Sequence, residues 1–349
     1  MERPFGDRGG KQGIMKALAL DFEARTLDWG ELDPPEFYAS RDVLYRVHEV
    51  GVCGTDRALA SFQLGAPPAG EARLILGHEA LGQVIDTGAG VKALNRGEWV
   101  APTVRRACKP PCSSCARGRR DLCVSGKYTE RGIFGLHGYF TEMAVDAEED
   151  LVRVPLKLVD FGVLVEPLSV AEKAIMRALA VHEGEPRTAI VLGLGPIGML
   201  AAMALKARGY GVKVQSLEPA DHPRAAILRL QDIPYEPGLT GSADIVIEAT
   251  GSTEAALFAL EQMPPLGVMV VLGAANGAGP VPFLRMIVNN QTVVGSVNAD
   301  GEAFRAAVED LARFDRRALA ALITRARFSD LKKSLTGAFS VAPKVVHVL

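Results

Sequence analysis

A glycine-rich turn after an apolar segment constrains this chain more than any other feature. Residues 189–198 read AIVLGLGPIG, with glycines at positions 193, 195 and 198. Gly193 suits a tight turn, Gly195 lets the backbone approach a diphosphate, and Gly198 allows close packing of helix on strand. Pro196 suits the first position of a helix, where its missing N–H costs nothing. The segment therefore predicts a strand, a turn and a helix whose N-terminus binds a dinucleotide.

The rest of the second half supports this interpretation, because apolar strands alternate there with helices. The expected strands are 189–192, 212–217, 243–249, 268–272 and 292–297. Continuous apolar strands separated by helices predict a doubly wound parallel sheet that is covered on both faces.

The first half has a different character, with short alternating strands and turns rich in glycine and proline. The expected strands are 15–20, 42–50, 79–86, 98–102 and 139–145. They predict a twisted, partly open β-barrel. We expect this first domain at 14–172, with a helix over 168–181 at its boundary, and the cofactor domain at 173–300. Residues 301–349, with a helix over 302–314 and a last strand over 345–349, should return to complete the first domain.

An acidic residue at the end of the second strand bears on the choice of cofactor. Glu218 lies 20 residues beyond Gly198, which is the separation expected for a carboxylate that binds the adenosine ribose. Such a carboxylate repels a 2′-phosphate and favours NAD, while Arg224 and His222 nearby leave NADP as a second option. The predicted cofactor contacts are Gly193, Gly195, Pro196, Ile197, Gly198, Glu218, Thr250, Gly251, Leu272 and Asn298.

Length and charge exclude several classes of protein. The 349 residues suffice for two domains, and a net charge of −2 gives no field that attracts nucleic acid. No apolar run reaches the roughly 18 residues of a membrane helix. Residues 1–13 lack the apolar stretch of a secretory signal, so we expect a frayed extension and a cytoplasmic protein.

Four of the five cysteines crowd into one short segment. Cys108, Cys112, Cys115 and Cys123 lie within 16 residues. In a reducing compartment this spacing favours metal over disulfides, and four thiolates close a tetrahedral zinc shell with no open position. An iron–sulfur cluster is chemically compatible, but a nicotinamide enzyme needs no one-electron relay. We therefore predict a structural zinc.

The fifth cysteine belongs to a second candidate metal site. Cys53 stands in GVCGTD, His78 and Glu79 stand in GHE, and Glu166 stands near the expected domain boundary. One thiolate, one imidazole and one or two carboxylates leave a zinc position open for a water or an alcohol. Because Cys53 with both glutamates would bring three negative charges to Zn²⁺, we expect one glutamate to bind firmly at a time.

These motifs occur in the order seen in the zinc-dependent medium-chain alcohol dehydrogenases, which the chain resembles from residue 15 onward. Within that superfamily it looks most like the glucose dehydrogenases first known from archaea. The similar segments are 104–106 (VRR), 118–123 (GRRDLC), 137–142 (HGYFTE), 166–168 (EPL) and 294–298 (VGSVN). Two departures are an extra residue between Cys108 and Cys112 and the missing basic residues at 217–220, where NADP-using relatives grip the 2′-phosphate.

The resemblance implies a GroES-like catalytic domain and a Rossmann cofactor domain. It also implies catalytic-zinc ligands at Cys53, His78 and Glu166 or Glu79, a hydroxyl relay at Thr55, and sugar contacts from Glu130 and Asn298. We take Thr55 and Glu166 as the catalytic residues. The implied reaction is oxidation of an aldose at its anomeric carbon with NAD(P).

Two alternatives remain open at this point. A polyol, amino-alcohol or simple alcohol dehydrogenase would use the same chemistry, and a silent binding protein could retain the fold. Because the apolar strand 292–297 lies at an expected sheet edge, we also expect a homodimer or homotetramer.

Overall fold

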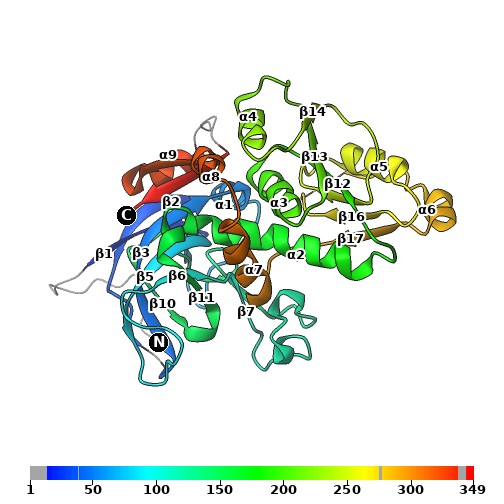
Figure 1. Cartoon of the computed structure of the whole chain (residues 1–349). Helices are drawn as coiled ribbons and strands as arrows, with labels where there is room; N and C mark the ends of the chain where they lie inside the picture. The colour runs from blue at the N-terminus through cyan, green and yellow to red at the C-terminus, as the bar shows by residue number, and fades with distance from the viewer. Residues whose placement is uncertain (1–13, 38, 275–276, 337–342) are drawn as a thin grey trace.

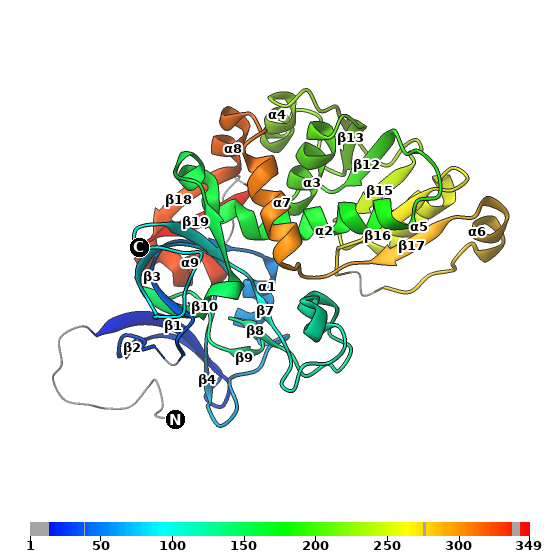
Figure 2. The same ribbon diagram turned by 60° about the horizontal axis from the view of Figure 1, so that its bottom comes forward.

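The computed structural model describes residues 14–37, 39–274, 277–336 and 343–349. The predicted N-terminal extension, 1–13, lies outside these residues. Helix α2 (Val165–Val181) runs between two sheet-containing parts, as two views of the ribbon agree (Figures 1 and 2). Within the described ranges, none of the helices has the length and apolar character that crossing a bilayer requires.

The second half contains a six-stranded sheet in which all neighbours are parallel. Its strands are β12 (Thr188–Leu192), β13 (Gly211–Ser216), β14 (Tyr235–Pro237), β15 (Ile245–Glu248), β16 (Val268–Val271) and β17 (Thr292–Gly295). Its helices are α3 (Pro196–Ala207), α4 (Pro223–Arg229), α5 (Thr253–Gln262) and α6 (Phe283–Asn289). The spatial order β14-β13-β12-β15-β16-β17 is that of a doubly wound dinucleotide fold, so the predicted sheet is confirmed.

Both faces of this sheet are buried, because successive side chains of a strand point to opposite sides. Val191 and Ile247 join the core formed with α2 and α3, while their neighbours Ile190 and Val246 join a separate core under α5. The runs of consecutive apolar residues at 189–192 and 245–247 therefore reflect a sheet that is covered on both faces.

Three further sheets, rich in turns, make up the other part of the molecule. The first consists of β1 (Met15–Asp21), β2 (Thr26–Leu32) and β4 (Arg73–Ile75). The second consists of β3 (Asp42–Val52), β5 (Glu79–Thr87), β6 (Trp99–Pro102), β10 (Met143–Ala147), β11 (Leu151–Val154), β18 (Ile323–Arg327) and β19 (Lys344–Val348). The third consists of β7 (Arg105–Arg106), β8 (Thr129–Arg131) and β9 (Gly135–Leu136).

One predicted strand begins later than expected. The segment 139–145 was expected to be extended throughout, whereas β10 spans Met143–Ala147. The N–H groups of Tyr139 and Phe140 instead donate to the carbonyls of Gly77 (2.9 Å) and Leu76 (2.8 Å). Both aromatic side chains are buried, so their apolar character reflects a core loop.

The C-terminal residues lie in the sheet of the first half. Strand β19 pairs antiparallel with β3 and parallel with β18. The remaining helices are α1 (Gly54–Ala60), α7 (Gly301–Leu311), α8 (Arg316–Leu322) and α9 (Leu331–Thr336). The short 3₁₀ helices are η1 (Cys115–Arg117), η2 (Arg120–Leu122), η3 (Glu148–Asp150), η4 (Leu156–Leu164) and η5 (Phe328–Asp330). The predicted domain boundaries after 172 and 300 remain predictions.

Candidate metal centres and cofactor site

The lone thiol, Cys53, is held by the helix that it caps. Its Sγ accepts the N–H of Thr55 at 3.2 Å, and its own N–H donates to Asp56 Oδ2 at 2.9 Å. This reciprocal capping box follows from the local sequence CGTD, which has an acid three residues after the cap. The thiol therefore lies at the N-terminus of α1, where burial, together with the charge of Asp56, raises its pKa.

An imidazole faces this thiol. His78 Nε2 lies 3.2 Å from Cys53 Sγ, and His78 Nδ1 lies 3.3 Å from Asp56 Oδ1. Burial opposes a charge on His78, but the neighbouring Cys53 and Asp56 raise its pKa well above the usual range. Asp56 thus sits behind the ring on the side away from the thiol, as the acid partners of metal-bound histidines do.

Two buried glutamates complete the group. Glu79 Oε1 pairs with Lys344 Nζ at 2.5 Å, while Glu79 Oε2 is buried and has no hydrogen-bond partner within the described ranges. Glu166, in the first turn of α2, has its pKa raised to about 8 by burial and by the charge of Glu79. Lys344 thus compensates Glu79 Oε1, whereas Glu79 Oε2 stays unpaired and the two carboxylates repel each other.

These residues fit a divalent metal. Ligand atoms of Cys53, Asp56 and His78 lie within 4.8 Å of one another, and so do those of His78, Glu79 and Glu166. A thiol, an imidazole and two carboxylates suit zinc, and a cation would relieve both the orphaned Glu79 oxygen and the carboxylate repulsion. The structure thus brings together the four predicted ligands of the catalytic metal. Which glutamate binds remains a prediction.

The position of Glu79 depends on a glycine in the neighbouring strand. Gly51 of β3 pairs with Glu79 of β5, and a Cβ placed on Gly51 would lie 2.0 Å from Glu79 Oε2. The missing side chain of Gly51 therefore makes the room that the Glu79 carboxylate occupies beside Lys344.

Replacing Gly51 with alanine should consequently act through Glu79. We expect kcat to fall on the order of tenfold to a hundredfold, because the carboxylate must rotate away from Lys344. Zinc content and steady-state kinetics would measure this. In the double variant of Gly51→Ala and Glu79→Ala, the second substitution should lower kcat little further. Gly54→Ala is a matched control, since a Cβ there meets nothing within 4 Å. Equal loss in both glycine variants would contradict the account.

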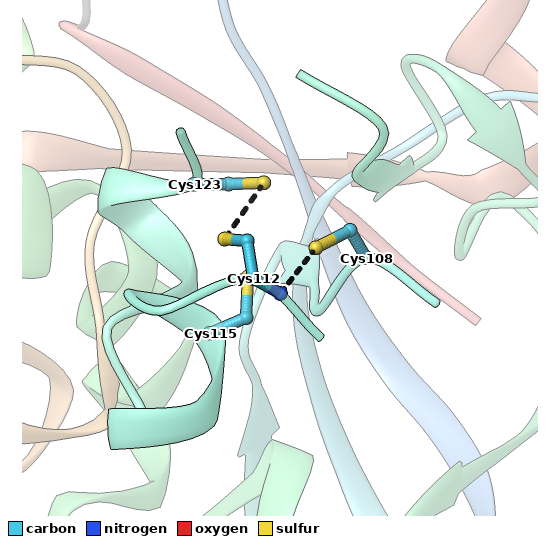
Figure 3. A group of neighbouring side chains, drawn as sticks. All are labelled: Cys108, Cys112, Cys115 and Cys123. Carbon is cyan, nitrogen blue, oxygen red and sulfur yellow. Dashed lines mark hydrogen bonds between the residues drawn. The ribbon is translucent and has the colours of Figure 1, made fainter. Parts of the chain in front are cut away.

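The four remaining cysteines converge as predicted (Figure 3). Their sulfur atoms all lie within 4.8 Å of one another, and Cys112 Sγ is 3.8 Å from Cys123 Sγ, too far for a disulfide. The N–H of Cys112 donates to Cys108 Sγ at 3.1 Å. Backbone N–H groups, chiefly that of Cys115, lower the pKa of Cys112 to about 5. Four cysteine sulfurs gathered in this way suit a tetrahedral zinc.

The glycine turn has the geometry that its sequence predicts. Gly193 has φ +111°, and a Cβ on Gly198 would lie 2.2 Å from the Gly193 carbonyl oxygen. A Cβ on Gly195 would meet nothing within 4 Å, so the N-terminus of α3 is open toward a ligand. Pro196 and Ile197 occupy the first turn of α3. This surface can bind a diphosphate.

Other predicted cofactor residues lie at the carboxyl ends of the strands. Glu218 follows β13, and its carboxylate accepts the Ser216 hydroxyl. Thr250 and Gly251 follow β15, where their N–H groups donate to the buried Glu248 Oε1 at 2.6 and 3.1 Å. Leu272 follows β16. This edge is where doubly wound sheets bind their ligands.

The two predicted sugar contacts meet although 168 residues separate them. Asn298 Nδ2 donates to Glu130 Oε1 at 2.8 Å, and Asn298 has a left-handed backbone with φ +61°. Glu130 also pairs with Arg105 at 3.0 Å across β7 and β8. The structure therefore brings these two residues together, whereas the hydroxyl relay of Thr55 remains a prediction.

Two residues of the site were missed from the sequence. The first is Asp56, which lies three residues after Cys53, the spacing of a capping box. No pattern in the neighbouring sequence indicates a role for Lys344, because a lysine in a C-terminal strand is expected to be a solvated charge. It reaches Glu79 only because β19 pairs with β3, which in turn pairs with β5.

Comparison with known proteins gives a consistent result. Residues 159–348 match the glucose dehydrogenase C-terminus family, and residues 39–156 match the alcohol dehydrogenase GroES-like domain. A glucose 1-dehydrogenase 2 of Vulcanisaeta moutnovskia is 36% identical over 88% of this chain and 91% of the relative. A glucose 1-dehydrogenase of Thermoproteus tenax is 39% identical over 77% of this chain and 80% of the relative.

Solved structures extend the similarity over nearly the whole chain. The glucose dehydrogenase of Haloferax mediterranei, solved with NADP, zinc and gluconolactone, superposes with a TM-score of 0.87 at 30% identity. The match covers 96% of this chain and 99% of that one. The GroES-like and Rossmann predictions are thereby confirmed, and the chain belongs to the zinc-dependent medium-chain alcohol dehydrogenase superfamily, within its glucose dehydrogenase family.

Proposed function

We propose that this chain oxidises an aldose, glucose or a close relative, at its anomeric carbon to an aldonolactone, with NAD(P)⁺ as hydride acceptor. The observation that carries the proposal is the Glu130–Asn298 pair, which joins two halves of the chain in one polar contact. A binding protein without catalysis would not need the cluster of Cys53, His78, Glu79 and Glu166 beside a dinucleotide fold. The relative with bound gluconolactone supports a sugar substrate.

The Glu130–Asn298 pair suits a polyhydroxylated ligand. The hydrogen bonds from Arg105 and Asn298 all fall on Glu130 Oε1, which leaves the Oε2 lone pairs for a sugar hydroxyl. A charged acceptor of this kind favours ligands with a hydroxyl at the matching position, because Oε2 of this half-buried carboxylate then gains a partner within the site. This favours an aldose over a simple alcohol.

The chain's own residues would bind and orient the reacting groups. Cys53, His78 and one glutamate would hold zinc, which supplies Lewis-acid polarisation of the substrate hydroxyl when bound. Asp56 and Lys344 would keep His78 and Glu79 in place, and the Thr55 hydroxyl would receive the substrate proton and pass it toward solvent. The glycine turn would hold the dinucleotide, which accepts the hydride.

We further propose that NAD is the preferred cofactor. The carboxylate of Glu218 would repel a 2′-phosphate, and Leu217 and Pro219 beside it carry no positive charge. The Haloferax relative was solved with NADP, and the nearby Arg224 would still allow that cofactor to bind.

We propose a cytoplasmic location for the enzyme. The support for this is the cluster of four free cysteines, which is typical of a metal site in a reducing compartment.

A panel of glucose, galactose, xylose, sorbitol, threonine and ethanol, each with NAD⁺ and with NADP⁺, tests both proposals. We expect reduction of cofactor with the aldoses, formation of a lactone, and the larger kcat/KM with NAD⁺. Turnover of sorbitol, threonine or ethanol alone would establish the alternative polyol, amino-alcohol or alcohol dehydrogenase. A preference for NADP⁺ would refute the assignment of Glu218.

We also propose a homodimer, or a homotetramer built from it, through the edge strand β17. In the described part of the chain β17 pairs with β16 alone, so its outer edge is available to a symmetric copy. The preceding helix α6 exposes Phe283 (67%), Leu284 (76%) and Ile287 (73%). Such a contiguous apolar surface next to an open strand edge is typical of a protein interface.

The variant Ile287→Glu should therefore dissociate the oligomer, because it buries a charge in an apolar contact. Light scattering after size exclusion would show a smaller particle. Leu156→Glu is the matched control, since Leu156 is 78% exposed and lies outside α6 and β17. A monomeric wild-type protein, or an unchanged mass in Ile287→Glu, would count against this interface.

A further inference from the structure

A buried lysine on α2 connects three segments that are distant in sequence. Lys173 is 3% exposed, and its Nζ contacts both Asp121 Oδ2 at 2.8 Å and the Val297 carbonyl oxygen at 2.7 Å. It lies seven residues after Glu166, on the same face of the helix and about 10 Å along its axis. One rigid helix thus carries a candidate metal ligand and a lysine that holds the 297–298 segment.

The first partner, Asp121, belongs to the loop that carries the four cysteines. It lies in η2, two residues before Cys123, and is 3% exposed. Its backbone carbonyl accepts Arg105 Nη1 at 2.8 Å, and its carboxylate also meets Arg119 at 3.3 Å. Figure 2 shows this teal loop beside β7 and β8. The cysteine loop is therefore anchored to α2 by its side chain and to β7 by its backbone.

The second partner, Val297, precedes the sugar-contact candidate Asn298. A left-handed backbone at a residue other than glycine must be held by its surroundings. Here the Val297 carbonyl is held by Lys173 and the Asn298 side chain by Glu130. The two residues of this turn are thus each held by a hydrogen bond, Val297 through its carbonyl and Asn298 through its side chain.

The contacts close into a ring. Lys173 binds Asp121, whose backbone binds Arg105, which binds Glu130. Glu130 accepts Asn298, and the carbonyl of the preceding Val297 returns to Lys173. Arg105, Lys173 and Asp121 are each less than 9% exposed, so their charges depend on one another and not on water.

We propose that Lys173 is a positioning residue for the sugar site. Its ion pair with Asp121 connects it to the cysteine loop, and this loop holds Glu130 and Asn298 in position. This inference rests on the proposed function for the role of that pair. The four-cysteine loop would then position the sugar-binding residues in addition to stabilising its own fold. Disturbance of the loop or of Lys173 would displace the hydroxyl-binding groups and leave the catalytic cluster and the glycine turn intact.

The test is Lys173→Met, which keeps the length of the side chain and removes the charge. We expect the KM for the aldose to rise about tenfold or more, as for loss of a charge-assisted hydrogen bond. The change in kcat should be smaller, with zinc content and the NAD⁺ dissociation constant measured without sugar near wild type. Asp121→Asn should raise the same KM, and the double variant should show less than the product of the two effects.

Glu172→Gln is the matched control. Glu172 is the adjacent residue on α2, is also buried, and pairs with Arg208, which follows the last residue of α3. It should lower thermal stability without raising the KM for the aldose. If Glu172→Gln raises that KM as much as Lys173→Met does, the effect is general destabilisation and the proposal is overturned.

A second measurement needs no substrate. Amide hydrogen exchange over 296–300 should become faster in both variants. In Lys173→Met the Val297 carbonyl loses its partner, and in Asp121→Asn the lysine that holds this carbonyl loses its own ion pair. Unchanged exchange in both variants would overturn the inference even if the enzyme oxidises glucose. Conversely, faster exchange in a protein that oxidises no aldose would sustain the link between loop and turn while the sugar assignment failed.

Discussion

Cys53→Ser should lose on the order of a thousandfold or more in kcat/KM, equivalent to about 4 kcal/mol of transition-state stabilisation. The fold should survive the change. The serine hydroxyl can accept the Thr55 N–H as Cys53 Sγ does, so the cap of α1 is retained. What disappears is the sulfur atom that faces His78 at 3.2 Å.

Metal analysis gives this prediction a second readout. We expect about two zinc ions per wild-type chain and about one in Cys53→Ser, with little change in thermal stability. Cys112→Ser is the matched control in the other cluster, and it should show the reverse pattern of lower stability with the Cys53 cluster still loaded. A Cys53→Ser protein with two zinc ions and normal turnover would show that the catalytic metal is elsewhere.

Alanine at two glycines of the dinucleotide turn should separate folding from cofactor binding. Gly198→Ala should lower the free energy of unfolding by about 1–3 kcal/mol, because its Cβ would lie 2.2 Å from the Gly193 carbonyl and the helix must shift. Gly195→Ala should leave stability nearly unchanged, since φ is −84° there and a Cβ meets nothing within 4 Å.

Of the two variants, the more stable one, Gly195→Ala, should bind NAD⁺ more weakly. The new methyl of Gly195→Ala occupies the approach to the diphosphate, so we expect the NAD⁺ dissociation constant to rise about tenfold or more. Denaturant unfolding and titration with NAD⁺ measure the two effects. If Gly195→Ala binds NAD⁺ normally, the diphosphate does not approach this backbone, and the assignment of the turn fails.

Particular residues show which features of the fold could be predicted from the sequence. The turn at 193–198 and the spacing of the four cysteines are local features, in which neighbours in the chain are also neighbours in space. Apolar periodicity likewise predicted the parallel sheet, because only a sheet covered on both faces needs continuous apolar strands. It failed at 139–145, where apolar residues serve a core loop.

Contacts between distant segments could not be inferred in this way. Lys344 meets Glu79 across 265 residues, and Gly51 makes room for Glu79 only through the pairing of β3 with β5. The ring through Lys173 likewise depends on how α2 packs between two sheets, which no spacing in the chain records.

By itself the sequence determined the dinucleotide turn and the four-cysteine cluster, because each rests on a short stretch of the chain. The apolar patterns of the two halves predicted the two domain types, and the order of the motifs supplied the second set of metal-binding residues. Only the tertiary structure decided which buried charges face each other. That choice depends on strand register and helix packing, where the cost of an unpaired charge in a dry interior selects one arrangement of side chains.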